Sequence, residues 1–222
     1  MGDTNTLYKY NGITLEKINK FEELYKNLDS SRNYYYLNRK IFQYKDNGFK
    51  EIDVPLISDD HCTVNQVLLD SKGQFWVSMD DYCLKGVTKY DGSNWTDYVT
   101  RDIFNNDVGN SIYGIIESKN GKILFSTGTS IIKYDGKNWS VFLDFSSKLG
   151  KPTISYGLFE DSKGNIWFGY DNLYKYNVSK IQEIDIAQYP KQGVYSRLIN
   201  TYFEDSKGNL WIGTGDGIFK VK

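Results

Sequence analysis

The stretch Asp205-Ser206-Lys207-Gly208-Asn209-Leu210-Trp211-Ile212-Gly213-Thr214 decides the fold of this 222-residue chain. It reads as the end of one strand, a tight turn and a second strand, because Asp, Asn and Gly favour hairpin turns. Similar stretches occupy residues 161–169 and 70–77, and weaker copies occupy 119–125, with Leu124 at the tryptophan position, and 29–36, with Tyr35 there. The turn glycines at 73, 121, 164 and 208 are separated by 48, 43 and 44 residues, so the chain is built from repeats.

A second element follows each clear copy of the turn. It reads Lys-Tyr-Asp-Gly at residues 89–92 and 133–136 and Lys-Tyr-Asn at 175–177. A large apolar residue stands five positions after each of these tyrosines, namely Trp95, Trp139 and Ile181. The same offset joins Tyr44 to Phe49 and Tyr10 to Leu15, so the repeat extends toward the start of the chain.

Each repeat of about 44 residues contains four short runs rich in Tyr, Phe, Trp, Ile and Val. In the clearest repeat the runs are residues 155–160, 166–170, 173–176 and 181–186. Four antiparallel strands in 40 to 50 residues are typical of one blade of a β-propeller, so the predicted fold class is all-β. The tryptophan position falls in the second strand, where we expect a large flat side chain to fill the space between adjacent blades.

The repeats predict a single propeller domain over residues 1–222, most simply with five blades. The expected blades cover about residues 20–54, 63–99, 111–144, 154–187 and 198–222, and the N-terminal segment 5–19 closes the last blade. This count leaves one segment that matches the third strand of a blade without a place. The alternatives are that the chain is a segment of a six- or seven-bladed ring, or that two chains share a blade. Residues 20–40 fit a strand by position, although Phe21, Leu24, Tyr25 and Leu28 also have helical spacing.

The run from Phe203 to Thr214, followed by a Gly-Ile-Phe-Lys strand, resembles the two-component regulator propeller repeat. That repeat builds sensor domains of bacterial hybrid histidine kinases, and the resemblance covers the chain from about residue 21 to its end. It implies a sensory or carbohydrate-related role and an extracytoplasmic location. The family's repeats are structural, so the resemblance implies no catalytic residues.

Composition excludes several classes of function. The chain has 27 basic and 28 acidic residues, which gives no electrostatic reason to bind nucleic acid or an anionic membrane. No run approaches 18 apolar residues, so we expect no membrane insertion. The first residues are polar and lack the features of a signal peptide. The sequence alone therefore predicts a protein that is either cytoplasmic or already separated from its signal.

The longer connections predict which face of the propeller binds a ligand. Short Asp-Ser-Lys-Gly and Tyr-Asp-Gly turns lie on one face, whereas the connections at 54–63, 100–111, 144–154 and 187–195 lie on the other. Aromatic and amide residues near the start of each first strand could ring the channel mouth on that second face. The candidate ligand-binding residues are Asn65, Tyr113, Tyr156 and Asn200. The alternative is that these side chains only pack the channel wall.

One cluster could bind a metal. His61, the only histidine, adjoins Cys62, and Cys83 lies in a loop expected on the same face. The two cysteines could be free thiols, form a disulfide or join His61 as metal ligands, but neither spacing is a recognised zinc pattern. The Asp-Ser-Lys-Gly turns lack the carboxylate density of a calcium loop, so we expect their aspartates to cap turns. No phosphate or dinucleotide motif is present, and no cofactor is predicted.

Three functions remain open from the sequence. The first is a non-catalytic, sensor-like module that binds a small molecule, carbohydrate or protein at the channel mouth. The second is a scaffold that associates with itself or with a partner through its terminal blade. The third is a metal-dependent lyase or lactonase, which the single histidine disfavours.

Overall fold

The computed structural model describes residues 7–10, 15–18, 34–37, 40–45, 48–52, 64–79, 86–104, 111–150, 155–186 and 198–221. The chain divides into two compact units, Met1–Val54 and Pro55–Lys222, which are called unit 1 and unit 2 below. The described regular structure is almost entirely antiparallel β-sheet, as the sequence predicted.

Unit 1 contains parts of two repeats. The strands β1 (Leu7–Tyr10) and β2 (Leu15–Ile18) pair as a hairpin that matches the third and fourth strands of a blade. A second sheet has the order β3 (Tyr34–Leu37), β4 (Lys40–Lys45) and β5 (Gly48–Ile52). The predicted first strand of this blade, and the helical alternative for residues 21–28, lie outside the described residues. The count of five blades and closure by residues 5–19 stay predictions.

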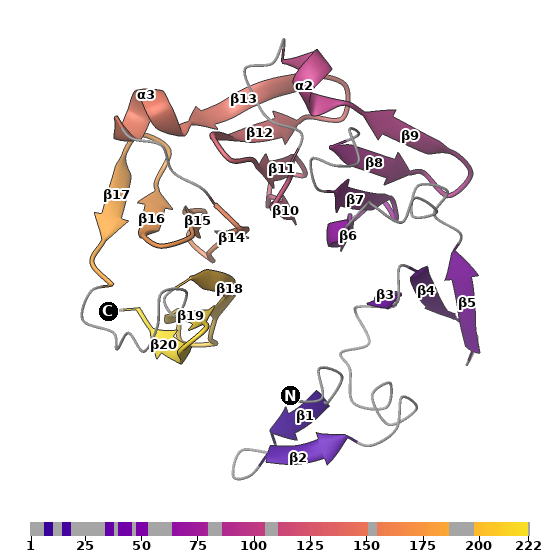
Figure 1. Ribbon diagram of the computed structural model, residues 1–222, viewed down its shortest axis with the longest axis horizontal. Coiled ribbons are helices and arrows are strands. Elements are labelled where there is room, and N and C mark those ends of the chain that lie inside the picture. The colour runs from indigo at the N-terminus through magenta and orange to yellow at the C-terminus, as the bar shows by residue number, and fades with distance from the viewer. Residues whose placement is uncertain are drawn as a thin grey trace. The chain divides into compact units, whose positions relative to one another are not determined.

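Unit 2 contains three complete four-stranded sheets and one three-stranded sheet among its described residues (Figure 1). Each sheet follows the order of the chain, so each is one blade with its first strand innermost. The innermost strands of successive blades contact one another. The strands are β6 (Val64–Leu69), β7 (Phe75–Met79), β8 (Val87–Tyr90) and β9 (Trp95–Tyr98); β10 (Gly114–Glu117), β11 (Ile123–Ser126), β12 (Ser130–Tyr134) and β13 (Trp139–Asp144); β14 (Gly157–Glu160), β15 (Ile166–Gly169), β16 (Leu173–Tyr176) and β17 (Ile181–Ile184); and β18 (Ile199–Glu204), β19 (Leu210–Thr214) and β20 (Gly217–Lys220).

The connections after two blades contain helical turns that the sequence did not indicate. The helix α2 (Thr100–Ile103) follows β9, and α3 (Phe145–Leu149) follows β13. Thr100 and Phe145 are buried, so tertiary contacts rather than helical periodicity stabilise these short segments. The connections predicted at residues 100–111 and 144–154 therefore begin with short helical turns that sequence reasoning did not assign.

The aspartate of the turn motif binds both the turn and the tryptophan. One carboxylate oxygen of Asp161 accepts hydrogen bonds from the backbone N–H groups of Lys163 and Asn165, at 3.0 and 2.8 Å. The other oxygen accepts one from the Trp167 indole at 2.9 Å. Asp70 with Trp76, and Asp205 with Trp211, repeat the arrangement at 2.8 and 3.0 Å. The predicted turn-capping role is confirmed, and the same carboxylate also fixes the indole.

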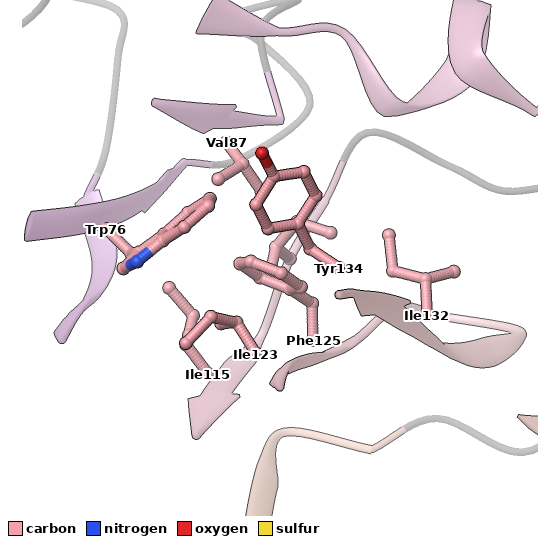
Figure 2. Packing of buried hydrophobic residues seen from close by; sticks show 8 residues of the cluster. Trp76, Val87, Ile115, Ile123, Phe125, Ile132 and Tyr134 are labelled. Atoms are coloured by element: carbon pink, nitrogen blue, oxygen red, sulfur yellow. The ribbon is translucent and has the colours of Figure 1, made fainter. Parts of the chain in front are cut away.

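Burial of the tryptophan position joins each blade to the next. Trp76 is only 1% exposed and packs against Ile115, Phe125 and Tyr134 of the following blade, as Figure 2 shows. Trp167 is 7% exposed and clusters with Ile212 and its neighbours in the last blade. Burying a large apolar side chain contributes about 1.5–3 kcal/mol. The prediction that the tryptophans form the core between blades is confirmed for Trp76 and Trp167, whereas Trp211 of the last blade is half-buried.

A glutamate at the end of the innermost strand forms a second link between blades. Both oxygens of Glu117 accept hydrogen bonds from Ser71 in the turn of the preceding blade, from its N–H at 2.7 Å and its hydroxyl at 2.6 Å. Glu204 binds Ser162 in the same way, at 2.6 and 2.7 Å. The link joins residues that are 46 or 42 positions apart. The turn of one blade is thereby fixed to the first strand of the next.

We expect Asp161→Ala to destabilise the protein by about 1–3 kcal/mol, because it leaves the buried Trp167 indole and two backbone N–H groups without an acceptor. Urea unfolding followed by tryptophan fluorescence measures the change. Asp171→Ala, at an exposed turn residue, serves as the control and should change stability by less than about 0.5 kcal/mol. Equal losses in the two variants would contradict the role assigned to Asp161.

Acidification should destabilise the fold through the same turns. Hydrogen bonds from the Trp211 indole and Asn209 hold the pKa of Asp205 below its usual value of 3.8. Burial raises the pKa of Asp161, but hydrogen bonds from Asn165 and Trp167 outweigh it and lower the pKa overall. A lowered folded-state pKa gives stability that is present above about pH 4 and is lost as the pH falls through the folded value. The urea concentration at the midpoint of unfolding should therefore fall as the pH is lowered from 6 to 2. It should fall less in the double variant Asp161→Asn/Asp205→Asn, and an equal fall in the two proteins would contradict this role.

Candidate functional site

The four predicted site residues occupy one structural position in four successive blades. Each of them stands four residues before the end of an innermost strand. Asn65 and Asn200 are the extra residues of β-bulges near the starts of β6 and β18. Tyr113 and Tyr156 lie directly before β10 and β14 and donate their backbone N–H to Ser126 O and Gly169 O. A bulge turns a side chain out of the regular sheet alternation, which explains why this position departs from the pattern of the strand.

Two of the four residues come into direct contact. The rings of Tyr113 and Tyr156 meet edge to face with centroids 4.6 Å apart. Tyr156 also meets Tyr170 edge to face at 4.2 Å, which extends the contact to a row of three tyrosines. Sequence reasoning missed Tyr170, which follows β15. It could have been found by aligning the residue three positions after the tryptophan position of each second strand, where the other blades have Met79, Thr127 and Thr214.

The asparagines differ in their environment. The side-chain amide of Asn65 donates to the carbonyl of Ile112 in the next blade at 3.0 Å, so part of its role is to join blades. Asn200 is exposed at the same position of the last blade. The position as a whole therefore presents aromatic rings flanked by amides, and it holds no acidic or basic side chain.

Burial, and then the neighbouring Tyr170, raises the pKa of Tyr156 above its usual value of 10. The Tyr156 hydroxyl therefore stays protonated at neutral pH, and the side chain is 36% exposed. A neutral phenol can donate one hydrogen bond and accept others. A partly exposed phenol ring can therefore pack against the apolar face of a ligand ring. Its hydroxyl group can form hydrogen bonds with hydroxyl groups of the same ligand.

Close approach of the innermost strands holds the tyrosines together. A methyl group added at Gly114 would lie 2.8 Å from Ser126 Oγ and 3.1 Å from the backbone nitrogen of Leu158 in the next blade. The backbone N–H of Ile115 is also bound by the Gln66 side chain of the preceding blade at 2.6 Å. Gly114 therefore permits the spacing at which Tyr113 reaches Tyr156.

No group of three or more His, Cys, Asp or Glu side chains that could hold a metal ion occurs within the described ranges. His61, Cys62 and Cys83 lie outside those ranges, so the alternatives for them stay open. Two cavities of unit 2 lie at the opposite ends of the strands, beside the short turns, rather than at the tyrosines. The helices in the described part of the chain are all too short or too polar to cross a membrane.

The four-stranded blades, with innermost strands in contact and a core at each blade boundary, define unit 2 as β-propeller structure. Residues 149–172 and 196–216 match the two component regulator propeller family, so the repeats resembling that family are confirmed there. No curated protein sequence matches the chain.

Solved propellers are similar to the chain at low sequence identity. A streptogramin B lyase has 20% identity and a TM-score of 0.61, with 85% of this chain and 61% of the lyase covered. Virginiamycin B lyase from Staphylococcus aureus has 20% identity and a TM-score of 0.59, with 82% and 62% covered. The extracellular domain of a protein designated a hybrid two-component system from B. thetaiotaomicron has 20% identity and a TM-score of 0.58, with 84% and 27% covered. The chain thus spans about three-fifths of each lyase and about a quarter of that extracellular domain, and the likeness shows the fold.

Replacing Gly114 by Ala should separate the innermost strands and destabilise the protein by about 1–3 kcal/mol, because the new methyl group meets backbone atoms of the next blade. Gly128→Ala is the matched control, since its methyl group would meet only the Tyr113 ring, at 4.0 Å. Thermal unfolding gives the stability, and near-UV circular dichroism reports the packing of the tyrosines. A wild-type spectrum and stability for Gly114→Ala would contradict the close approach.

Proposed function

We propose that this chain is a non-catalytic binding module of a sensor-like propeller, with its ligand site at the starts of the innermost strands. The observation that supports this most is the partly exposed tyrosine row, in which Tyr113 and Tyr156 share one position of adjacent blades and Tyr170 extends their contact. A site built on strands of a rigid sheet positions its side chains more precisely than a site on a loop. The match to two-component regulator propeller repeats supports the sensory role.

The ligand class that suits this position is a carbohydrate. Sugar rings present an apolar face that packs on aromatic rings, and hydroxyls that pair with amides and phenols. Asn65, Asn200 and the Tyr156 hydroxyl are the polar groups of the site, and no ionic partner is needed. A small polar metabolite or a protein surface with a similar polarity is the alternative ligand.

The lyase and lactonase alternative has less support. Propeller enzymes named as lyases are similar to this chain in fold at about 20% identity, which carries no activity over to it. Among the described residues no three or more His, Cys, Asp or Glu side chains gather at the tyrosine row, as a metal-dependent propeller enzyme would need. We therefore favour binding over catalysis.

A scaffold function has one specific observation in its favour. On the last blade Phe203 and Ile218 are 62% and 75% exposed, and Phe203 pairs with Trp211 across β18 and β19. In the preceding blade the corresponding residues Phe159 and Trp167 pack against the blade that follows. Another sheet could bury this exposed apolar face in the way that one blade buries the next. That sheet could come from this chain, from a second copy of it or from a partner protein.

A thermal-shift screen with oligosaccharides and small metabolites tests the proposed site. A ligand at 100 times its dissociation constant should stabilise the protein by about 2.7 kcal/mol, which is a shift of about 5–10 °C for a domain of this size. Tyr156→Ala should weaken binding at least about fivefold, because truncating a central aromatic contact costs more than about 1 kcal/mol.

Gln182→Ala is the control variant, since Gln182 is exposed on the outermost strand β17, and it should bind as the wild type does. A ligand that binds Tyr156→Ala and the wild type equally would place the site elsewhere. A shift seen only with divalent metals would favour the enzyme, and concentration-dependent mass without any ligand would favour the scaffold.

A further inference from the structure

Among the three boundaries between the described blades of unit 2, the one after β10–β13 lacks the indole that fills the other two. Trp76 and Trp167 are each fixed by an aspartate and lie beneath a lysine, with Lys89 Nζ 5.6 Å and Lys175 Nζ 5.1 Å from the ring centroids. In the blade β10–β13 the tryptophan position is Leu124, the aspartate position is Ser118, and the lysine remains as Lys133 opposite Leu124. Its ammonium therefore has no indole to cover at this boundary.

A cavity of about 260 Å³ lies at this boundary, between β10–β13 and β14–β17. Its buried apolar wall is formed by Leu124 and Ile166. The other lining side chains that matter here are Lys133, Phe142, Tyr176 and Glu160. An apolar cavity of about 150 Å³ is already sufficient to bind benzene. The cavity can therefore hold a bicyclic aromatic ring.

The aromatic side chains around the missing indole are retained. At the Trp76 boundary Tyr98 and Tyr134 are 5.8 Å apart and flank the indole at 6.1 and 5.3 Å. Figure 2 shows Tyr134 against Trp76 there. At the Leu124 boundary Phe142 and Tyr176 hold the same two positions, with ring centroids 5.6 Å apart. The walls that receive an indole in one boundary thus line the cavity in the other.

Glu160 offers the cavity a hydrogen-bond acceptor. The equivalent Glu117 and Glu204 each bind a serine through both carboxylate oxygens. Lys119 replaces that serine here, and its backbone N–H binds only Oε2 of Glu160, at 2.7 Å. Within the described part of the chain no donor reaches Oε1. This oxygen is therefore available to a ligand donor.

The rim of the cavity contains the only non-glycine residue with a positive φ among the described residues. Val178 has a φ of 70° and is 83% exposed, whereas Gly92 and Gly136 occupy this turn position in the preceding blades. The left-handed conformation costs a β-branched residue about 1–2 kcal/mol. Such strain is concentrated at ligand sites, and Val178 adds apolar surface to the cavity entrance.

We propose that this cavity binds a small planar aromatic molecule of about the size of indole that carries one ring N–H or hydroxyl donor. The ring lies against both Phe142 and Tyr176, as Trp76 lies against Tyr98 and Tyr134, with the Lys133 ammonium over its face, and the donor binds Glu160 Oε1. The site is separate from the tyrosine row, because it lies beside the turns at the opposite ends of the strands. It does not depend on the proposed function.

Indole and 5-fluoroindole are the probes, and fluorine NMR measures binding to the intact chain. We expect a dissociation constant of about 1 mM or tighter, as for other ligands of this size. Ser118→Asp/Leu124→Trp rebuilds the aspartate–indole pair within the cavity and should weaken binding at least about tenfold. If the double variant does not fold, the single variant Leu124→Phe takes its place, because it also fills the cavity with an aromatic ring.

The donor is tested separately with 1-methylindole, which lacks the N–H. It should bind the wild type about fivefold more weakly than indole does, and Glu160→Gln should remove this difference. Gln182→Ala on the exposed outer strand is the control and should leave both affinities unchanged. Absence of binding at 10 times the expected dissociation constant of about 1 mM would overturn the proposal, as would unchanged binding in the filled variants.

Discussion

Burial of one sheet face by the next blade is the constraint on which the rest of unit 2 depends. A single four-stranded blade exposes the tryptophan position, and only a neighbouring blade removes it from water. The aspartate that closes the hairpin turn also binds the indole, so the turn and the packed ring are stabilised together. The glutamate of the next blade then binds the same turn. Local turn structure and packing between blades are thus parts of one hydrogen-bonded arrangement.

In the blade β10–β13 the aspartate, serine and tryptophan positions of this arrangement are all replaced together. An aspartate without its indole would keep a buried carboxylate oxygen without a donor, which costs about 1–3 kcal/mol. Ser118 replaces it, and its hydroxyl still caps the turn through Lys122 and Asn120. Lys119 replaces the serine that the glutamate would have bound, and its ammonium instead donates to the carbonyl of Asp161 at 2.7 Å. Three substitutions at one boundary therefore keep the turn capped and the blades linked, and leave both Glu160 Oε1 and the space of the indole open.

The sequence predicts the strands well because their signals are local. Gly73, Gly121, Gly164 and Gly208 have φ values of 73–80°, the conformation in which glycine avoids the penalty of a side chain, so the turns could be placed from residue type alone. The helices α2 and α3 could not be predicted, because four or five residues carry no helical period and depend on buried contacts. Tyr170 and the glutamate links were missed for a related reason. They join residues of different blades, whose proximity follows only from the packed structure.

The two ends of the strands are under different constraints, and this explains where variation can occur. At the turn ends the aspartate, indole, lysine and glutamate positions are coupled, so a single change there leaves a buried polar group without its partner. At the starts of the innermost strands Asn65 and Asn200 emerge from bulges, while Tyr113 and Tyr156 precede their strands and contact each other. Asn65, Tyr113, Tyr156 and Asn200 can therefore differ between blades at little cost to the fold. Recognition of a specific ligand requires such freedom, whereas a site at the turn ends requires a coordinated set of changes, and the Leu124 boundary has that set.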